Sequence, residues 1–254
     1  ENNWQPNLEH LESQISDKTR GIVVINPNNP TGAVYSKETL EKILLIAKKH
    51  NLIIFSDEIY SKVLFDEVKH IPMATLTKDV LIVTFNGLSK NYRACGFRAG
   101  WLYVTGPVEE AAGYLDGLTQ LVSMRLCSNV PGQWAIQTAL GGYQSIFDLC
   151  ANDGRLKKQR DLTLQRLNAI EGIRCIVPQA SLYAFAEIDL DLYNFSSDED
   201  FVLKFLEEKH VLFVHGSGFN YDRSAAFRVV FLPHLETLSD AFDRLEDFLK
   251  KNRR

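Results

Sequence analysis

Short hydrophobic runs alternate with a stretch of helical periodicity in the first half of the chain. After Ser36, which is a favourable N-cap, apolar residues recur at the spacing of one helix face. Near-continuous apolar runs separated by such a helix are typical of a largely parallel sheet covered on both faces. We therefore expect an α/β fold for this half. The predicted strands are Gly21–Asn26, Leu52–Phe55, Val80–Phe85 and Gly100–Val104, and the helical face is Leu40, Ile43, Leu44 and Ala47.

The pattern changes after about residue 150. The stretch Gly154–Ile170 is rich in Arg, Lys, Gln and Leu, which predicts a long, partly exposed helix joining two domains. Ser197 and Asp200 then have the spacing of a capping box, with Asp in place of the usual Glu. We expect a large domain over residues 1–150, and the interdomain helix with a small α+β domain over residues 151–254. The strands expected in the small domain are Ile173–Val177, Leu182–Ile188, Val211–Val214 and Phe227–Leu232.

Composition narrows the class of protein. The chain has 254 residues, 45% of them hydrophobic and 24% charged, with a formal net charge of -4, which is ordinary for a globular protein. A nucleic-acid partner would favour a basic stripe, and a membrane partner a long apolar run, and the sequence has neither. The four cysteines and six histidines are scattered, which favours free thiols in a reducing cytoplasm and argues against a metal site.

Four polar segments each lie next to an apolar strand, most of them directly after one. In open α/β sheets, ligands bind at the carboxyl ends of the strands. Taken singly, each segment has an ordinary structural explanation: a tight turn, an N-cap at Asp57, a surface lysine whose stem packs on apolar neighbours, and an ion pair of Arg98. The four segments are Asn26–Gly32, Ser56–Tyr60, Asn86–Arg93 and Gly96–Gly100.

In this order, the segments resemble the class I (fold-type I) pyridoxal-phosphate aminotransferases. The resemblance extends over the whole chain and rests on Asn29-Pro-Thr-Gly, Asp57-Glu-x-Tyr, Ser89-Lys90 and Gly96-x-Arg-x-Gly. It implies part of the mixed, mostly parallel seven-stranded sheet domain of that fold, followed by a small C-terminal α+β domain. The segments most similar to the bacterial alanine (glutamate–pyruvate) aminotransferases are Asn26–Tyr35, Thr84–Gly100 and Met124–Pro131.

The resemblance implies pyridoxal 5'-phosphate as cofactor and gives roles to residues that would bind it. Lys90 matches the catalytic lysine that holds the cofactor and then moves the proton from the substrate Cα. Asp57 matches the carboxylate that pairs with the pyridinium nitrogen and strengthens the ring as an electron sink. Tyr60 and Asn29 match the two side chains that bond the 3′ oxygen of the cofactor.

Further residues match the groups that bind phosphate and carboxylate. Arg98 is similar to the phosphate-binding arginine, and Ser89 is expected to add a hydroxyl. Gly87 stands where many relatives carry Ser or Thr, which removes one phosphate contact. Arg228, flanked by apolar residues, matches the arginine that binds the α-carboxylate of the substrate. Asn29 is expected to bind the substrate as well.

Three other residues are expected to have structural roles. Tyr183 lies where relatives have a Gly-rich turn and an aromatic residue near the substrate, and packing is its expected role. His215 is expected to be a loop residue with no catalytic role. Cys95 is close to Lys90 in sequence and is expected to be a small packed thiol.

The resemblance implies amino transfer between L-alanine and 2-oxoglutarate, giving pyruvate and L-glutamate. Since motifs that bind the cofactor do not choose the substrate side chain, an aspartate, aromatic or branched-chain transaminase or a carbon–sulfur lyase stays open. A non-catalytic aminotransferase-like module is the alternative class. The resemblance also implies a homodimer. Because members of the class are longer, we expect this chain to be a fragment that is inactive or weakly active alone.

Overall fold

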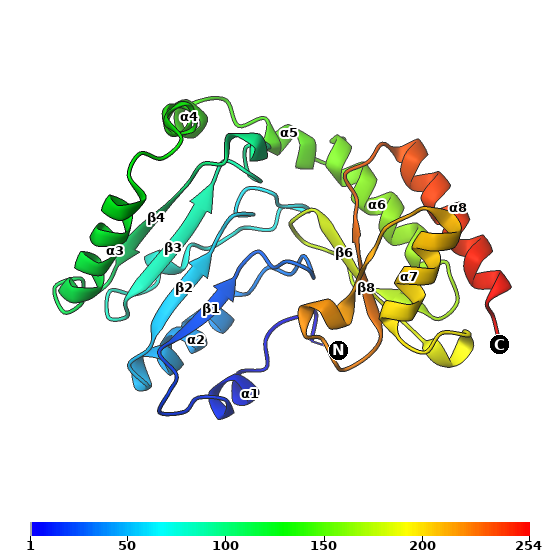
Figure 1. Cartoon of the computed structure of the whole chain (residues 1–254), viewed down its shortest axis with the longest axis horizontal. Coiled ribbons are helices and arrows are strands. Elements are labelled where there is room, and N and C mark those ends of the chain that lie inside the picture. Colours follow the sequence, from blue (N-terminus) through cyan, green and yellow to red (C-terminus); the bar gives the residue numbers. More distant parts are fainter. Residues whose placement is uncertain (1) are drawn as a thin grey trace. The chain divides into compact units, whose positions relative to one another are not determined.

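The computed structural model describes residues 2–254 and divides into two compact units (Figure 1). The predicted domain boundary after residue 150 stays a prediction; the main changeover between the units falls at Phe147–Asp148, within the helix α5 (Ile146–Cys150). The first unit contains the chain up to Pro27 together with Val34–Leu64 and Val68–Phe147. The second unit contains Asn28–Ala33, Phe65–Glu67 and Asp148–Arg254.

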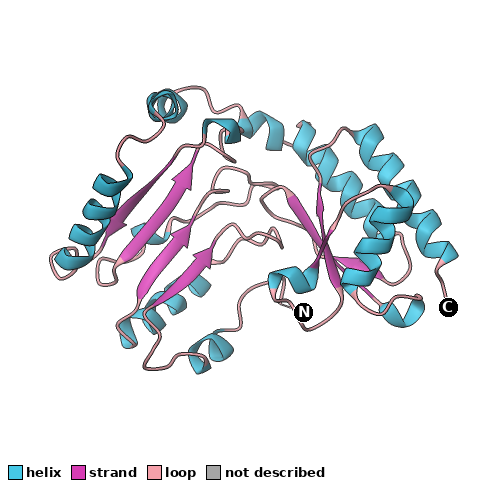
Figure 2. Cartoon of the chain, viewed as in Figure 1, coloured by secondary structure: helices cyan, strands magenta, loops and turns pink. Residues whose placement is uncertain are grey.

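A four-stranded sheet forms the centre of the first unit (Figure 2). Its order is β1-β2-β3-β4, in which the first three strands are parallel and β4 is antiparallel to β3. The predicted mixed, mostly parallel sheet is thus confirmed. The strands are β1 (Gly21–Ile25), β2 (Ile53–Asp57), β3 (Ile82–Gly87) and β4 (Gly100–Thr105).

The helix α2 (Lys37–Lys49) covers one face of this sheet. It begins at Ser36, whose hydroxyl accepts a hydrogen bond from Thr39 N at 3.1 Å, so the predicted N-cap is confirmed. The buried face of the helix consists of the residues that the periodicity predicted, together with Ile46. They form one core with residues of the strands, and the members of this core include Leu40, Ile43, Leu44, Ala47, Val24, Ile54 and Ile82.

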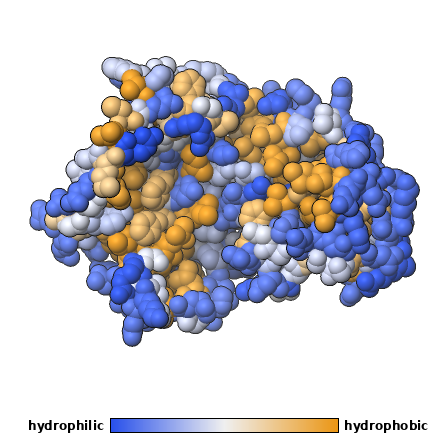
Figure 3. Space-filling model, in the orientation of Figure 1, coloured by the Kyte–Doolittle hydropathy of each residue, from blue (hydrophilic) through white to orange (hydrophobic). Residues whose placement is uncertain are grey.

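The other face of the sheet departs from the expectation that both faces are covered. Val23 is 68% exposed, and Leu102 of β4, which the register places on the same face, is also exposed. Hydrophobic surface is visible over this sheet in Figure 3. Among the described residues, helix α3 has no buried side chain, so it does not close this face. The remaining α-helices of the unit are α1 (Leu8–Ser13), α3 (Ala112–Arg125) and α4 (Val130–Gly141).

The second unit is built on an antiparallel sheet of order β5-β6-β8-β7. This is the small α+β arrangement that the sequence predicts, with helices packed on a short sheet. The expected strand Val211–Val214 is wrong in extent, because residues 211–213 are irregular after the left-handed C-cap at His210. The strands are β5 (Ile173–Cys175), β6 (Tyr183–Ile188), β7 (Val214–His215) and β8 (Ala226–Val230).

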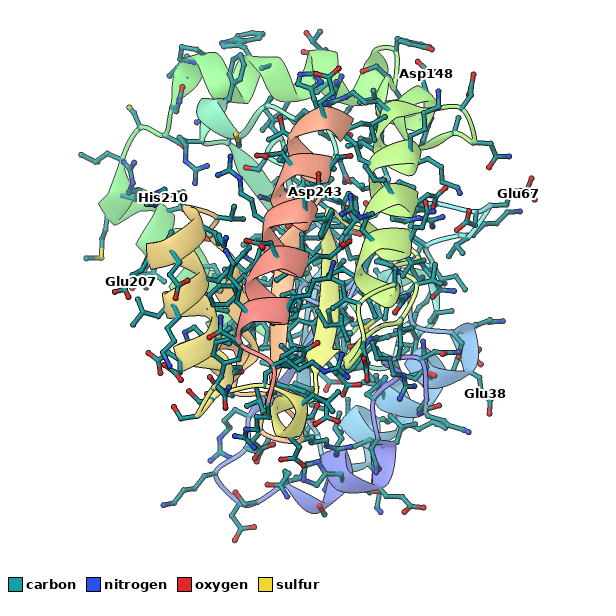
Figure 4. The ribbon with its side chains drawn as sticks, turned by 90° about the vertical axis from the view of Figure 1, so that its right-hand side faces the viewer. Glu38, Glu67, Asp148, Glu207, His210 and Asp243 are labelled. Carbon is teal, nitrogen blue, oxygen red and sulfur yellow. The ribbon has the colours of Figure 1, made fainter. Side chains whose placement is uncertain are left out.

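Three helices accompany this sheet: α6 (Arg155–Asn168), α7 (Asp198–Lys209) and α8 (Leu235–Lys251). A cluster of buried aromatic rings fills the core, with ring centroids 5.1 to 6.4 Å apart. On the outside, Asp243 of α8 forms an ion pair with Arg166 of α6 at 2.6 Å, and Figure 4 labels Asp243 on the helix facing the viewer. The rings in the core include Phe195, Phe201, Phe205, Phe213, Phe227 and Phe248.

Ser197 caps α7 as expected, since its hydroxyl accepts a hydrogen bond from Asp200 N at 3.0 Å. The return bond of a capping box does not form. The Asp200 carboxylate instead accepts from Ser196 N, one residue before the cap, at 2.9 Å. An Asp side chain is one methylene shorter than the usual Glu, so the capping-box prediction is only half right.

Two short segments from the first half of the chain pack within the second unit. The carbonyl of Gly32, which has a φ of +72°, accepts hydrogen bonds from the backbone N–H groups of Gln179 and Ala180, both at 2.9 Å. In the other segment, Asp66 pairs with the buried Arg160, whose guanidinium lies 4.9 Å from the ring of Phe65. These contacts explain why Asn28–Ala33 and Phe65–Glu67 group with the second unit.

The core of the second unit provides a stability test with a matched control. Leu245 of α8 is fully buried, whereas Leu203 of α7 is 52% exposed. Leu245→Ala is expected to lower the free energy of unfolding by about 2–5 kcal/mol, and Leu203→Ala by less than about 1 kcal/mol. Urea titration followed by circular dichroism measures both. Equal losses in the two variants would contradict this core assignment.

Candidate active site

The carboxyl ends of β1, β2 and β3 lie at one edge of the first unit's sheet, because the three strands are parallel. In the register, Asp57 at the end of β2 stands between Ile25 of β1 and Phe85 of β3. The segments that follow β2 and β3 carry Tyr60 and Lys90. This edge therefore collects Asp57, Tyr60 and Lys90, as expected for a ligand site in an open α/β sheet.

Asp57 does not cap a helix. Its Oδ1 accepts a hydrogen bond from Ile59 N at 3.1 Å, and a turn follows. Burial raises the pKa of the Asp57 carboxyl, the Ile59 N–H opposes this, and the neighbouring charge of Glu58 raises the pKa further. Among residues 2–254, no cationic side chain forms an ion pair with Asp57. The carboxylate is suited to accept a positively charged ligand group.

Glu58 and His70 form a buried pair that the sequence did not reveal. Glu58 is 3% exposed, and its Oε2 lies 3.0 Å from His70 Nε2. Its Oε1 accepts from Ser56 Oγ and Met73 N, both at 3.1 Å. No spacing rule connects Glu58 to a single histidine twelve residues away. The Glu58 carboxylate thus has its hydrogen-bond partners within the protein. Because successive side chains of an extended segment point to opposite faces, the Asp57 carboxylate points away from that of Glu58.

Lys90 and Tyr60 come together at this edge. The Lys90 Nζ lies 6.0 Å from the centroid of the Tyr60 ring, and Tyr60 is only 3% exposed. Lys90 itself is half-buried, three residues after β3 ends at Gly87. Ser89 is half-buried beside it, and its phosphate contact stays a prediction. An amine close to a phenol, at the same edge as an uncompensated carboxylate, is a suitable donor set for pyridoxal phosphate.

Gly87 and Gly100 face each other across β3 and β4. A Cβ on Gly87 would lie 3.1 Å from both the Ala99 carbonyl oxygen and Gly100 Cα, which is tighter than most real contacts. Glycine at position 87, where many relatives carry Ser or Thr, therefore allows the two strands to approach each other closely.

Arg98 is exposed and has a left-handed φ of +50°. Its Nη1 donates to the Cys95 carbonyl oxygen at 2.8 Å, while no ion pair joins it to any described residue. The ordinary structural alternative, an ion pair, is thus not present in residues 2–254, and the guanidinium keeps donors for an anion. Phosphate binding by Arg98 stays a prediction. Cys95 is exposed, so the expectation of a packed thiol is wrong; the loop that carries it, η2 (Cys95–Phe97), contains no buried residue.

Arg228 lies on β8 in the second unit, where it is half-buried. Its Nη1 donates to Asn29 Oδ1 at 3.0 Å, so two residues that are 199 positions apart in sequence lie in contact. The Nε of Arg228 is buried and makes no hydrogen bond with the described residues. A buried guanidinium donor without an acceptor costs free energy, and an incoming carboxylate would supply that acceptor.

Two aromatic rings pack on the Arg228 guanidinium. Its Cζ lies 4.4 Å from the Tyr183 ring and 4.9 Å from the Phe219 ring. Tyr183 was expected to pack, but Phe219 was missed, because nothing in its local sequence indicates Arg228 as a neighbour. His215 Nδ1 accepts from Gly218 N at 3.1 Å and so caps the short helix η4 (Gly216–Phe219), which carries Phe219.

Comparison with known proteins identifies the family. A family model described as aminotransferase class I and II matches residues 1–245. This chain belongs to that family. It is 50% identical to the glutamate–pyruvate aminotransferase AlaA of Haemophilus influenzae over 99% of this chain and 62% of that protein. It is 49% identical to the alanine aminotransferase of Mycobacterium tuberculosis over 97% of this chain and 57% of that protein. The chain thus spans about three fifths of the length of these relatives.

Solved aminotransferase structures share this fold. An Escherichia coli aminotransferase superposes with a TM-score of 0.96 at 48% identity, covering 99% of this chain and 62% of that one. The alanine aminotransferase of Pyrococcus furiosus gives a TM-score of 0.92 at 42% identity, covering 98% and 62%. The predicted fold-type I architecture is confirmed by these matches. Family membership implies pyridoxal phosphate as cofactor.

The described histidine, cysteine and acidic side chains include no group of three or more arranged to hold a metal ion. None of the described helices combines the length and apolar character needed to cross a bilayer.

The half-buried carboxyl of Asp57 provides a pH test. Because its folded pKa is raised, its contribution to stability falls as the pH rises above the ordinary aspartate value of about 3.9. Asp57→Asn keeps an acceptor for Ile59 N and removes the charge. We expect this variant to be more stable than wild type without cofactor at pH 7, and the advantage to shrink toward pH 4. Urea titrations across this range measure the difference.

Asp79 is the control for this test. Its partner Lys48 holds the pKa of the Asp79 carboxyl below its usual range. The ionised Asp79 carboxylate therefore stabilises the folded chain, whereas the ionised Asp57 carboxylate destabilises it. Asp79→Asn is expected to lower stability slightly at pH 7. If Asp57→Asn were less stable than wild type at every pH, burial of an uncompensated charge would be the wrong account of Asp57.

Proposed function

We propose that this chain carries the cofactor lysine, Lys90, and the carboxylate-binding arginine, Arg228, of a pyridoxal-phosphate-dependent alanine aminotransferase. The observation that carries the proposal is the position of Lys90 Nζ, 6.0 Å from the Tyr60 ring centroid at the sheet edge where Asp57 ends β2. An amine, a phenol and a half-buried carboxylate at one sheet edge are the groups that binding of pyridoxal phosphate requires.

In the first unit, each residue has a distinct task. Bound pyridoxal phosphate supplies the electron sink for the negative charge left when a proton leaves the substrate Cα. Lys90 Nζ holds the cofactor and moves that proton. The Asp57 carboxylate has no cationic partner among the described residues. Its negative charge stabilises the protonated form of the pyridine nitrogen. Tyr60 binds the 3′ oxygen, and Arg98 and Ser89 bind the phosphate.

In the second unit, Arg228 binds the α-carboxylate of the substrate. Its Nη1 is held by Asn29, its two aromatic neighbours fix the plane of the guanidinium, and its Nε is the donor that lacks an acceptor. Because Asn29 uses Oδ1 to hold Arg228, its Nδ2 stays available to donate, which suits the proposed bond to the 3′ oxygen of the cofactor.

The choice of L-alanine and 2-oxoglutarate rests on the names of the relatives that are about half identical to this chain. A panel of amino donors with 2-oxoglutarate separates this proposal from aspartate, aromatic or branched-chain specificity. Conversion of L-alanine to pyruvate should be the fastest reaction. We also propose a homodimer in a reducing cytoplasm; the four cysteines are free thiols in the structure.

The role of Lys90 is tested by reduction of the loaded protein. Pyridoxal phosphate is expected to give a visible absorption band, and borohydride should fix the cofactor on the peptide that contains Lys90. Lys90→Ala is expected to abolish both signals. Lys62→Ala is the matched control, since Lys62 is another half-buried lysine of the first unit, bonded to Tyr92 OH at 3.0 Å. Fixation on Lys62 in the wild-type chain would refute the assignment.

The role of Arg228 is tested by a change that keeps the charge. Arg228→Lys removes the planar fork, and we expect it to weaken L-alanine binding by about 10- to 100-fold. The change in the cofactor's visible spectrum on adding L-alanine gives the dissociation constant. Arg174→Lys, at an exposed position on β5, is the control and should bind L-alanine like wild type. Normal binding by Arg228→Lys would exclude a carboxylate contact.

A further inference from the structure

Two loops follow β2 and β3, and the amide side chains of the buried Asn91 and the half-buried Asn86 join them. Asn91, directly after Lys90, is 2% exposed. Its Oδ1 accepts from Lys62 N at 2.9 Å, and its Nδ2 lies within hydrogen-bond distance of Ser61 Oγ at 3.0 Å and Asn86 Oδ1 at 3.2 Å. Asn91 therefore connects the loop of Lys90 to the two residues that follow Tyr60.

Asn86, near the end of β3, extends this connection. Its Nδ2 donates to the Glu58 carbonyl oxygen at 3.1 Å and lies 3.3 Å from Ser61 Oγ. Its Oδ1 accepts from Gly87 N at 2.8 Å, in addition to the bond from Asn91. We call Asn86, Asn91 and Ser61 the amide latch. It lies entirely within the first unit.

We propose that Asn91 is a positioning residue for Lys90, which sets the distance of the lysine amine from Tyr60. On the other side of Lys90, Leu88 N donates to the Ala99 carbonyl oxygen at 3.0 Å, so the chain is held both before and after the lysine. The inference deepens the proposed function, on which it rests for the identity of Lys90 as the cofactor lysine.

The chemistry of position 91 favours an amide. One side chain must supply an acceptor for Lys62 N and donors for Ser61 and Asn86, and Asn offers both in one planar group. Asp would lose the donors and place a charge in a buried position. Alanine would leave the Lys62 N–H and the Asn86 oxygen with one partner fewer. Lys62 Nζ also bonds Tyr92 OH at 3.0 Å between the two loops. Asn91 is the neighbour of Lys90 whose side chain makes three hydrogen bonds.

The first experiment needs no cofactor. The purified chain is treated with an amine-acetylating reagent, and the rate at Lys90 is compared with that at the exposed Lys37 by peptide mass spectrometry. Asn91→Ala is expected to raise the relative rate at Lys90 by about threefold or more, because the loop opens locally. Ser61→Ala, which removes only one partner of the latch, should give a smaller increase. This milder variant covers the case in which Asn91→Ala does not fold.

The second experiment measures the function of the latch. Borohydride fixation of pyridoxal phosphate on Lys90 is expected to fall about tenfold in Asn91→Ala, since the amine is no longer held in place. Asn168→Ala is the matched control. Asn168 bonds Cys175 O at 3.0 Å and Cys175 N at 2.8 Å in the second unit, so its loss should lower stability without changing either readout at Lys90.

The outcomes separate the two proposals. An unchanged relative acetylation rate at Lys90 in both folded latch variants would overturn the positioning role. Normal fixation on Lys90 despite faster acetylation would also overturn it, because the latch would then be only structural. If the wild-type chain takes up no cofactor at all, the proposed function fails, whereas the acetylation comparison still decides whether Asn91 positions Lys90.

Discussion

The parallel hydrogen-bonded register of β1, β2 and β3 is the constraint on which the candidate site depends. It places Asp57 between Ile25 and Phe85 and brings the ends of three strands to one edge. Asp57 and Lys90 are more than thirty residues apart in sequence. They lie at the same edge of the sheet because the hydrogen bonds between the strands fix where β2 and β3 end. A slip of one residue would turn Asp57 to the opposite face of the sheet.

Local patterns predicted those parts of the structure that depend on local physics. The face of α2 follows from helical periodicity, and the cap at Ser36 from a single hydroxyl. Long-range contacts were not predictable in this way. The Glu58–His70 pair, the ring of Phe219 on Arg228 and the bonds of Asn91 all join residues that no spacing rule relates. The motif resemblance supplied most of the proposed site residues, and their roles stay proposals.

Two groups at the candidate sites make the folded chain less stable than it could be. Asp57 is held where burial disfavours its charge, and Arg228 keeps a buried Nε without an acceptor. The Glu58 carboxylate, next to Asp57, is by contrast satisfied by three hydrogen bonds. A charged group left without a partner at a sheet edge is expected where a ligand completes the structure.

The path of the chain has a consequence for how the protein can be divided. The backbone passes from one unit to the other at residues 27/28, 33/34, 64/65, 67/68 and 147/148. A recombinant piece starting at Asp148 would lack Asp66, the partner of Arg160, and Gly32, whose carbonyl accepts from Gln179 and Ala180. Each unit is compact, but neither is formed by one continuous stretch of sequence. A chimera that takes its second unit from a relative would therefore also have to take Asn28–Ala33 and Phe65–Glu67 from that relative.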